Sequence, residues 1–147
     1  MLKEVKSQKK LTKNKIVVGV LDDDIVKFLE KEKVPIHTKE IYLTSKGLSH
    51  LARDSKKKRG AGLSDEDILR IPEILESFTD IYFEIGKNRF NIIYCDFESK
   101  RCIKIAVDTK AYTNRKEKVT LIKSAGYINK EDMNNTKVYK HIYSKSN

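Results

Sequence analysis

The sequence predicts an α+β fold in which N-terminal helices pack on one face of an antiparallel sheet of about four strands. Up to residue 78, the segments between short strand-like runs carry apolar residues about every 3.6 positions, the period of a helix with one buried face. From residue 80 onward the period changes to about 2, which is typical of strands, and turn signals separate the runs. Helices that precede a set of strands in this way favour a helical layer on a sheet.

The first elements follow a basic arm. Residues 1–15 hold six lysines and one glutamate, which predicts a disordered segment that touches a phosphate backbone or serves only as a solubilising tail. Residues 16–147 are expected to form a single domain, because a chain of this length can bury one core. "KIVVGV" at 15–20 is β-branched and predicts a strand. An aspartate among residues 22–24 caps the helix that follows, and Pro35 ends it.

A second strand and further helices complete the first half of the chain. "IHTKEIYLT" at 36–44 is strand-like, and a helix is expected over about 46–57. The glycines of "KKKRGAG" at 56–62 stop that helix in a flexible basic loop. Ser64 starts the next helix, in which Pro72 predicts either a kink or two short helices.

Four runs of alternating residues predict the sheet: "DIYFEI", "RFNIIYCD", "RCIKIAVD" and "KVTLIKSAGY". "GKN" and "FESK" are turn signals, and "TKAYTNRKE" at 109–117 is predicted to be a longer basic loop. A short helix is expected at "NKEDMNN", and a last strand or helix at "VYKHIY". Helices cover one face of such a sheet, so the other face stays available for polar and cationic groups.

The charge balance favours a polyanionic partner. Lys and Arg outnumber Asp and Glu by 31 to 21, which gives a net charge of +10. Nucleic acid is the commonest partner of such an excess, and a merely soluble basic protein is the alternative. The sequence shows no apolar run that could span a bilayer and no secretory signal. A cytoplasmic location without membrane contact is therefore expected.

Neither the cysteines nor any motif indicates a metal ion or a cofactor. Cys95 and Cys102 are too few for a disulfide framework and are interpreted as reduced, although two strands of a hairpin would let them approach each other. The three aspartates at 22–24 do not point the same way, and a helix N-terminus accounts for them.

The order of four segments resembles a known nuclease family. "VGVLDDDIVKFL", "IYLTSKGLSHL", "LSDEDILRIPEILES" and "DIYFEI" follow one another as in the phage-associated barnase–EndoU–colicin–RelE-like nuclease domains, over roughly residues 16–128. The resemblance implies a compact α+β fold with a four-stranded antiparallel sheet. It also implies metal-independent cleavage of RNA, usually tRNA or mRNA, in a toxin, antiphage or mobile-element setting. An acidic immunity or antitoxin protein would be expected to cover the basic face of such a toxin.

Few residues carry over from the family. His50 stands where members often have a histidine after a "YLS"-like strand, and Lys123 with Ser124 stands where they often have a basic residue followed by Ser or Thr. Many members show a second histidine shortly after the first, whereas this chain has "ARDSKKKRG" there.

Metal-free RNA cleavage needs a base for the 2′-hydroxyl proton, an acid for the leaving 5′ oxygen and cations for the charge that develops on the phosphate. His50 is the predicted base or acid, because imidazole titrates near neutral pH without help. A structural or plain surface histidine is the alternative, and His37 and His141 are expected to be of that kind. Lys104, Lys123 and Ser124 complete the predicted catalytic set. The predicted substrate contacts are Arg53, Lys56, Lys57, Arg115, Thr120 and Tyr127.

Other interpretations stay open. Tyr112 and Tyr127 are candidates for stacking on unpaired bases, with ordinary packing as the alternative. The chain as a whole is either a ribonuclease, a non-catalytic RNA- or DNA-binding module, or an interaction protein whose charge serves only solubility. The catalytic hypothesis requires His50 to open onto the same hollow as Lys104 and Lys123.

Overall fold

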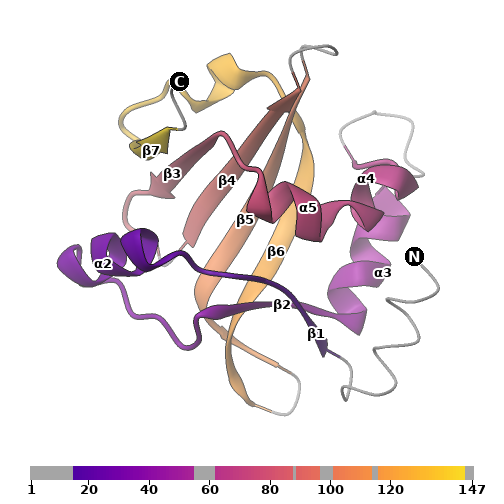
Figure 1. Cartoon of the computed structure of the whole chain (residues 1–147), viewed down its shortest axis with the longest axis horizontal. Helices are drawn as coiled ribbons and strands as arrows, with labels where there is room; N and C mark the ends of the chain where they lie inside the picture. The colour runs from indigo at the N-terminus through magenta and orange to yellow at the C-terminus, as the bar shows by residue number, and fades with distance from the viewer. Residues whose placement is uncertain (1–14, 55–61, 88, 97–100, 114–115, 145–147) are drawn as a thin grey trace.

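The computed structural model describes residues 15–54, 62–87, 89–96, 101–113 and 116–144 (Figure 1). The strands are β1 (Lys15–Val20), β2 (Glu40–Thr44), β3 (Asp80–Glu84), β4 (Arg89–Asp96), β5 (Arg101–Tyr112), β6 (Lys118–Ile128) and β7 (Tyr139–Ser144). The helices are α2 (Asp23–Lys31), α3 (Ser45–Asp54), α4 (Asp65–Leu69), α5 (Ile71–Glu76) and the 3-10 helix η1 (Lys130–Met133).

The strands form one mixed sheet of seven, in the order β1-β2-β6-β5-β4-β3-β7. All neighbours are antiparallel except β2 and β6, which are parallel through Ile41 opposite Thr120 and Tyr42 opposite Leu121. The predicted α+β class, with helices on about four antiparallel strands, is therefore wrong. The four predicted strands are β3 to β6, but β7 extends the sheet on one side, and β2 with β1 extends it on the other. Alternation along the chain identifies strand segments but not their partners, so it misses pairings between segments distant in sequence.

Several local predictions are confirmed. Ser64 caps α4, because its Oγ accepts a hydrogen bond from the N–H of Asp67 (3.2 Å). Pro72 lies at the start of α5, which separates the helical stripe into two short helices. One loop differs from its prediction: β5 continues to Tyr112, so the first four residues of the basic loop expected at 109–117 are strand.

The main core lies between the helices and one side of the sheet, which we call the helix-covered face. Buried residues from both layers form it, among them Leu29, Leu48, Ile74, Ile81, Ile92, Ile103, Ile105 and Val107. In Figure 1, α5 lies in front of this face, and α3 lies beside β6. The opposite side, which we call the second face, carries a smaller cluster made of Tyr82, Ile93, Cys102 and Met133. Met133 belongs to η1, so the connection from β6 to β7 covers part of the second face.

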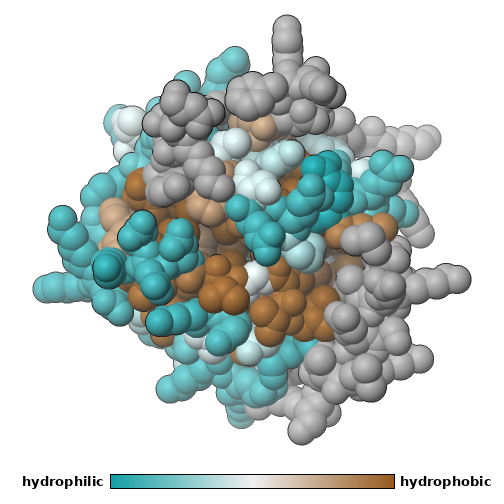
Figure 2. All heavy atoms as spheres, in the orientation of Figure 1, coloured by the Kyte–Doolittle hydropathy of each residue, from teal (hydrophilic) through white to brown (hydrophobic). Residues whose placement is uncertain are grey.

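The outer strand β1 leaves apolar residues exposed. Val17 and Val20 are 52% and 65% exposed, and Figure 2 shows apolar surface over the position of β1. The same strand packs closely on α5 at Gly19. A Cβ added at Gly19 would lie 3.0 Å from Cδ1 of Leu75, so this contact needs the smallest residue.

Cys95 and Cys102 form a disulfide, so their predicted reduced state is wrong. The two residues are directly opposite each other in the pair of β4 and β5, with Cα atoms 4.1 Å apart. A cysteine count does not reveal whether two strands align in this register.

Candidate nucleic-acid interface

The structure separates two of the predicted catalytic residues. His50 is exposed on α3, which packs on β2 and β6 in the helical layer. Lys104 alternates along β5 with Ile103 and Ile105, which belong to the main core, so Lys104 lies on the second face. His50 and Lys104 are therefore on opposite sides of the sheet and do not open onto one hollow.

His50 is held by its own helix. Nη2 of Arg53 lies 2.9 Å from Nδ1 of His50, one turn earlier on α3. Arginine only donates hydrogen bonds, so Nδ1 accepts and a neutral His50 carries its proton on Nε2. The lone pair that a base would use is thus already engaged by Arg53.

Lys104 and Ser124 are close on the second face. Ser124 pairs with Ala106, two residues along β5 from Lys104, which makes Lys104 and Ser124 diagonal neighbours. Lys104 is half-buried and Ser124 is exposed. Lys123 is also exposed, at the point where the register between β5 and β6 shifts.

Of the other predicted substrate contacts, Thr120 is buried and three residues are not described by the structure. Thr120 is fully buried: its hydroxyl donates to the carbonyl of Thr38 (2.6 Å), and its N–H donates to the Thr38 hydroxyl (2.9 Å). These bonds attach the segment before β2 to β6. Lys56, Lys57 and Arg115 lie outside the described residues.

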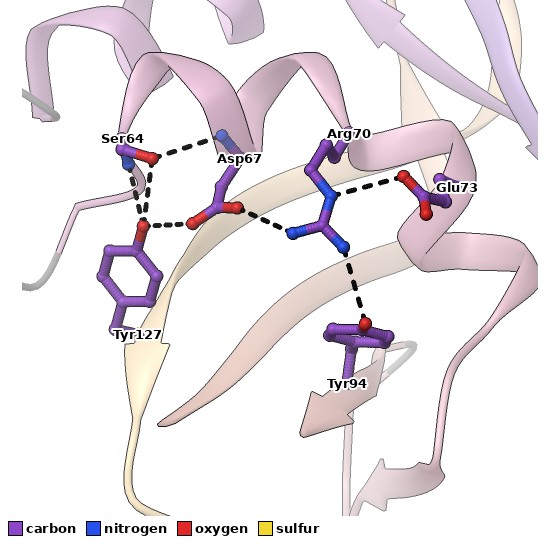
Figure 3. Close-up of polar contacts among 6 residues, drawn as sticks. All are labelled: Ser64, Asp67, Arg70, Glu73, Tyr94 and Tyr127. Carbon is purple, nitrogen blue, oxygen red and sulfur yellow. Dashed lines mark hydrogen bonds and ion pairs between the residues drawn. The ribbon is translucent and has the colours of Figure 1, made fainter. Parts of the chain in front are cut away.

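Tyr127 belongs to a polar network that fixes α4 to the sheet (Figure 3). Its hydroxyl accepts a hydrogen bond from the N–H of Ser64 (3.1 Å) and donates to the carboxylate of Asp67. Arg70 continues the network, donating to Asp67 (3.3 Å), to Glu73 (3.2 Å) and to the hydroxyl of Tyr94 (3.4 Å). The hydrogen bonds to Tyr94 and Glu73 raise the pKa of the Arg70 guanidinium above its usual value.

This network is not suited to an anion. Arg70 already contacts two carboxylates, those of Asp67 and Glu73, so a phosphate would meet no net positive charge there. The network therefore serves to join α4 and α5 to β4 and β6.

The end of the β5–β6 hairpin gathers lysines around an exposed tyrosine. We call Lys110, Tyr112, Lys116 and Lys118 the hairpin tip. Tyr112 is 54% exposed and lies directly opposite Lys118, and Lys110 precedes Tyr112 by two residues on β5. The lysines are all exposed. Figure 1 shows β5 and β6 extending past the other strands at this end.

Backbone hydrogen bonds join the two sides of this hairpin where its strands end. Thr113 donates its N–H to the carbonyl of Glu117 (3.0 Å), and Lys116 donates to the carbonyl of Thr113 (2.9 Å). Lys116 has φ of 63°, a left-handed conformation that is common in hairpin loops. These bonds hold the backbone next to Tyr112 and Lys118.

His37 supports Tyr112 from the segment before β2. Nδ1 of His37 donates to the carbonyl of Ala111 (3.0 Å), since a carbonyl can only accept. The two rings meet edge to face, with centroids 5.2 Å apart and planes at 71°. The hydroxyl of Thr109 donates to the carbonyl of Pro35 (2.8 Å) and joins the two segments again. Contacts within the chain thus position Tyr112.

Two carboxylates lie close to the lysines of the hairpin tip. Glu117 is paired with Lys15 (2.7 Å), and Asp108 accepts a hydrogen bond from the N–H of Lys110 (2.9 Å). Among these described groups, the three lysines of the hairpin tip and Lys15 outnumber the carboxylates of Glu117 and Asp108, which favours a positive field near Tyr112.

Asp80 and His141 form a further pair, which sequence patterns did not reveal. Nε2 of His141 lies 3.0 Å from Oδ1 of Asp80. The Asp80 side chain is 2% exposed, whereas that of His141 is 43% exposed. The two residues are 61 positions apart and meet only because β7 pairs with β3, so neither spacing nor periodicity could have joined them.

The comparisons with known proteins leave the family open. No protein-family model, curated protein or solved structure matches the chain. The resemblance to the phage-associated nuclease domains therefore stays a prediction. Within the described part of the chain, no group of three or more His, Cys, Asp or Glu residues could hold a metal ion, and no helix is long and apolar enough to cross a membrane.

Proposed function

We propose that the protein binds nucleic acid, single-stranded RNA in particular, through the hairpin tip. The observation that carries the proposal is the exposed ring of Tyr112, which His37 holds among three exposed lysines. An unpaired base stacks on such a ring, and lysines on either side contact the phosphates that flank it. A base within a duplex has no free face to offer, so an unpaired strand fits this arrangement best.

The charge of the whole chain supports the same partner. A net charge of +10 attracts a polyanion at long range, while the hairpin tip offers a place where one base and its phosphates meet fixed groups. Messenger RNA and the unpaired loops of tRNA both present such bases. We place this activity in the cytoplasm, where the fold would have to tolerate reduction of the Cys95–Cys102 bond.

Metal-independent RNA cleavage is the second candidate function. The observation that favours it is the contact between the exposed His141 and the buried Asp80, a pairing that suits proton transfer. Lys104 and Ser124 lie on the second face, where they would meet a phosphate that reached this pair.

Replacement of Tyr112 by alanine is expected to weaken RNA binding by about five- to 150-fold, because a stacked base contributes ~1–3 kcal/mol. Fluorescence anisotropy with a labelled single-stranded RNA of mixed sequence measures this change. The paired substitution Lys110→Gln with Lys118→Gln is expected to lower the slope of log K against log salt concentration by about 1.4, since each lysine releases about 0.7 counterion from a single strand.

The matched control is Lys27→Gln with Lys31→Gln, which removes two exposed lysines from α2. This pair is expected to keep the affinity within about threefold, an effect of net charge alone. Equal losses for both pairs would mean that RNA is held by diffuse charge rather than by the hairpin tip. Binding that does not depend on salt would exclude phosphate contacts altogether.

A further inference from the structure

We propose that His37 is a phosphate-binding residue of the hairpin tip, and that it makes this contact only in its protonated form. The inference rests on the proposed function, because it takes RNA as the partner of the hairpin tip. It goes further by adding a contact that depends on pH, made by a residue that so far serves only to support Tyr112. Its basis is the orientation of the His37 ring and the charges around it.

The position of His37 is fixed by its backbone and its ring together. Its backbone N–H donates to the carbonyl of Thr109 (2.9 Å), and its Nδ1 donates to the carbonyl of Ala111 (3.0 Å). Both acceptors belong to β5, so the residue is attached to the strand that carries Tyr112. The centroids of the His37 and Tyr112 rings are 5.2 Å apart, so a nucleotide stacked on Tyr112 lies beside His37.

The second nitrogen of the His37 ring is available to a ligand. Because Nδ1 carries the proton that is donated to Ala111, neutral His37 has a lone pair on Nε2. Among the described residues, Nε2 has no hydrogen-bond partner, and it is not one of their buried unpaired polar atoms. Solvent therefore reaches Nε2. Protonation turns this nitrogen from an acceptor into a charged donor, while the bond from Nδ1 to Ala111 stays as it is.

The described carboxylates do not neutralise a protonated His37. The charged and titratable groups on the elements beside it are those of the hairpin tip, together with Asp108, Glu117, Lys39 and Glu40. Glu117 contacts Lys15 (2.7 Å), and Asp108 accepts a hydrogen bond from the N–H of Lys110 (2.9 Å). Within the described part of the chain, His37 forms no ion pair with any of these carboxylates. Its positive charge is therefore left for an anion from outside the chain.

The other two histidines of the chain do not offer such a charge. Nδ1 of His50 accepts a hydrogen bond from Arg53, so a proton on that nitrogen would meet a guanidinium. The charge of a protonated His141 is balanced by the carboxylate of Asp80, 3.0 Å away. Of the three, His37 is thus the histidine whose protonation adds an unbalanced charge, and it does so beside the aromatic ring of the hairpin tip.

The direction of the pH effect follows from these charges. Imidazole takes up a proton in the range from about pH 8 down to about pH 5, and here the added charge lies near lysines that repel it. A phosphate offsets that repulsion and accepts a hydrogen bond from Nε2 of His37, so RNA binds the protonated form more tightly. The affinity for RNA is therefore expected to rise as the pH falls through this range.

The test is fluorescence anisotropy of the full chain with a labelled single-stranded RNA of mixed sequence, at about pH 8 and at about pH 5.5. The wild-type affinity is expected to be about tenfold higher at the lower pH, the effect of one charged hydrogen bond. The slope of log K against log salt concentration is expected to steepen by about 0.7 at the lower pH, because one further phosphate contact forms.

Two matched variants assign this effect to one histidine. His37→Gln keeps a donor for the carbonyl of Ala111 but takes up no proton, so both pH effects are expected to disappear while binding at the higher pH changes little. His50→Gln makes the same substitution on α3 and is expected to retain both effects. In NMR spectra of the wild-type chain, the ring signals of His37 are expected to titrate at higher pH with RNA than without it.

RNA that binds equally well at both pH values overturns this inference and leaves the proposed function standing. A pH effect that survives His37→Gln, or that disappears in His50→Gln, has the same meaning. If circular dichroism shows that His37→Gln does not fold, the wild-type titration decides, and His37 signals that RNA does not move overturn the inference. Absence of RNA binding at both pH values overturns the proposed function as well.

Discussion

Asn91 is a buried residue whose side-chain amide forms no hydrogen bond. It lies in the middle of β4, between Tyr82 of β3 and Ala106 of β5, and it is 1% exposed. Neither Oδ1 nor Nδ2 of its side chain has a hydrogen-bond partner. A buried amide left in this state costs about 1–3 kcal/mol, so the sheet carries a local cost beside the His141 site.

Replacement of Asn91 by leucine is expected to raise the free energy of unfolding by about 1 kcal/mol or more, because an apolar group of similar size removes the unsatisfied amide. Urea denaturation followed by circular dichroism measures the change. Asn91→Ala is the control: it also removes the amide but leaves a cavity, so its gain should be smaller. A marked loss of stability with leucine would mean that the amide of Asn91 has a partner after all.

Some residues of the candidate site could be predicted from the sequence, and others could not. Lys104 was found because a cation interrupts an apolar strand, and its face follows from alternation with Ile103 and Ile105. His141 could not be found, because its relation to Asp80 depends on a bulge and on a strand pairing. The importance of His50 was inferred from a short motif, which carries no information on the contact with Arg53.

At the scale of elements, α4 and α5 are attached to the sheet by two tyrosines. The cap at Ser64 could be predicted, since it involves residues three positions apart. The attachment of Ser64 to Tyr127 could not, because 63 positions separate them and the contact depends on how β6 is placed. Local sequence thus defines these helices, and distant tyrosines define where they lie.

Tyr127→Phe is expected to lower the free energy of unfolding by about 1 kcal/mol, because the N–H of Ser64 and the carboxylate of Asp67 lose their shared partner. Hydrogen exchange should become faster in α4, and this is the measurement that locates the effect. Tyr94→Phe removes a longer bond, to Arg70, and should cost less. Weaker RNA binding by Tyr127→Phe at unchanged stability would instead support the predicted role of Tyr127 in substrate contact.

At the scale of the whole molecule, the sheet depends on contacts between distant parts of the chain. Alternation correctly identified the segments that become β3 to β6, because each carries its own pattern. The order of the strands could not be predicted from the sequence, since β2 joins β6 through only two aligned residue pairs. The disulfide between β4 and β5 adds a covalent link to the part of the sheet that the sequence described best.

Reduction of the Cys95–Cys102 bond is expected to lower the free energy of unfolding by about 2–3 kcal/mol, the chain-entropy value for a closed loop this short. Urea denaturation with and without a thiol reductant gives the difference. The double variant Cys95→Ser with Cys102→Ser should show no response to the reductant. A reduced protein as stable as the oxidised one would mean that the bond contributes nothing, and that a reducing compartment leaves the fold unchanged.

The parallel pairing of β2 with β6 has a consequence for synthesis on the ribosome. The first strands emerge early, yet the strand that receives them is translated some eighty residues later. Until β6 has been synthesised, Ile41 and Leu43 cannot be buried in the main core. The nascent chain must therefore avoid non-native contacts of these apolar side chains. The antiparallel hairpins from β3 to β6 form between neighbours, so they are ready to act as the template on which the N-terminal strands finally dock.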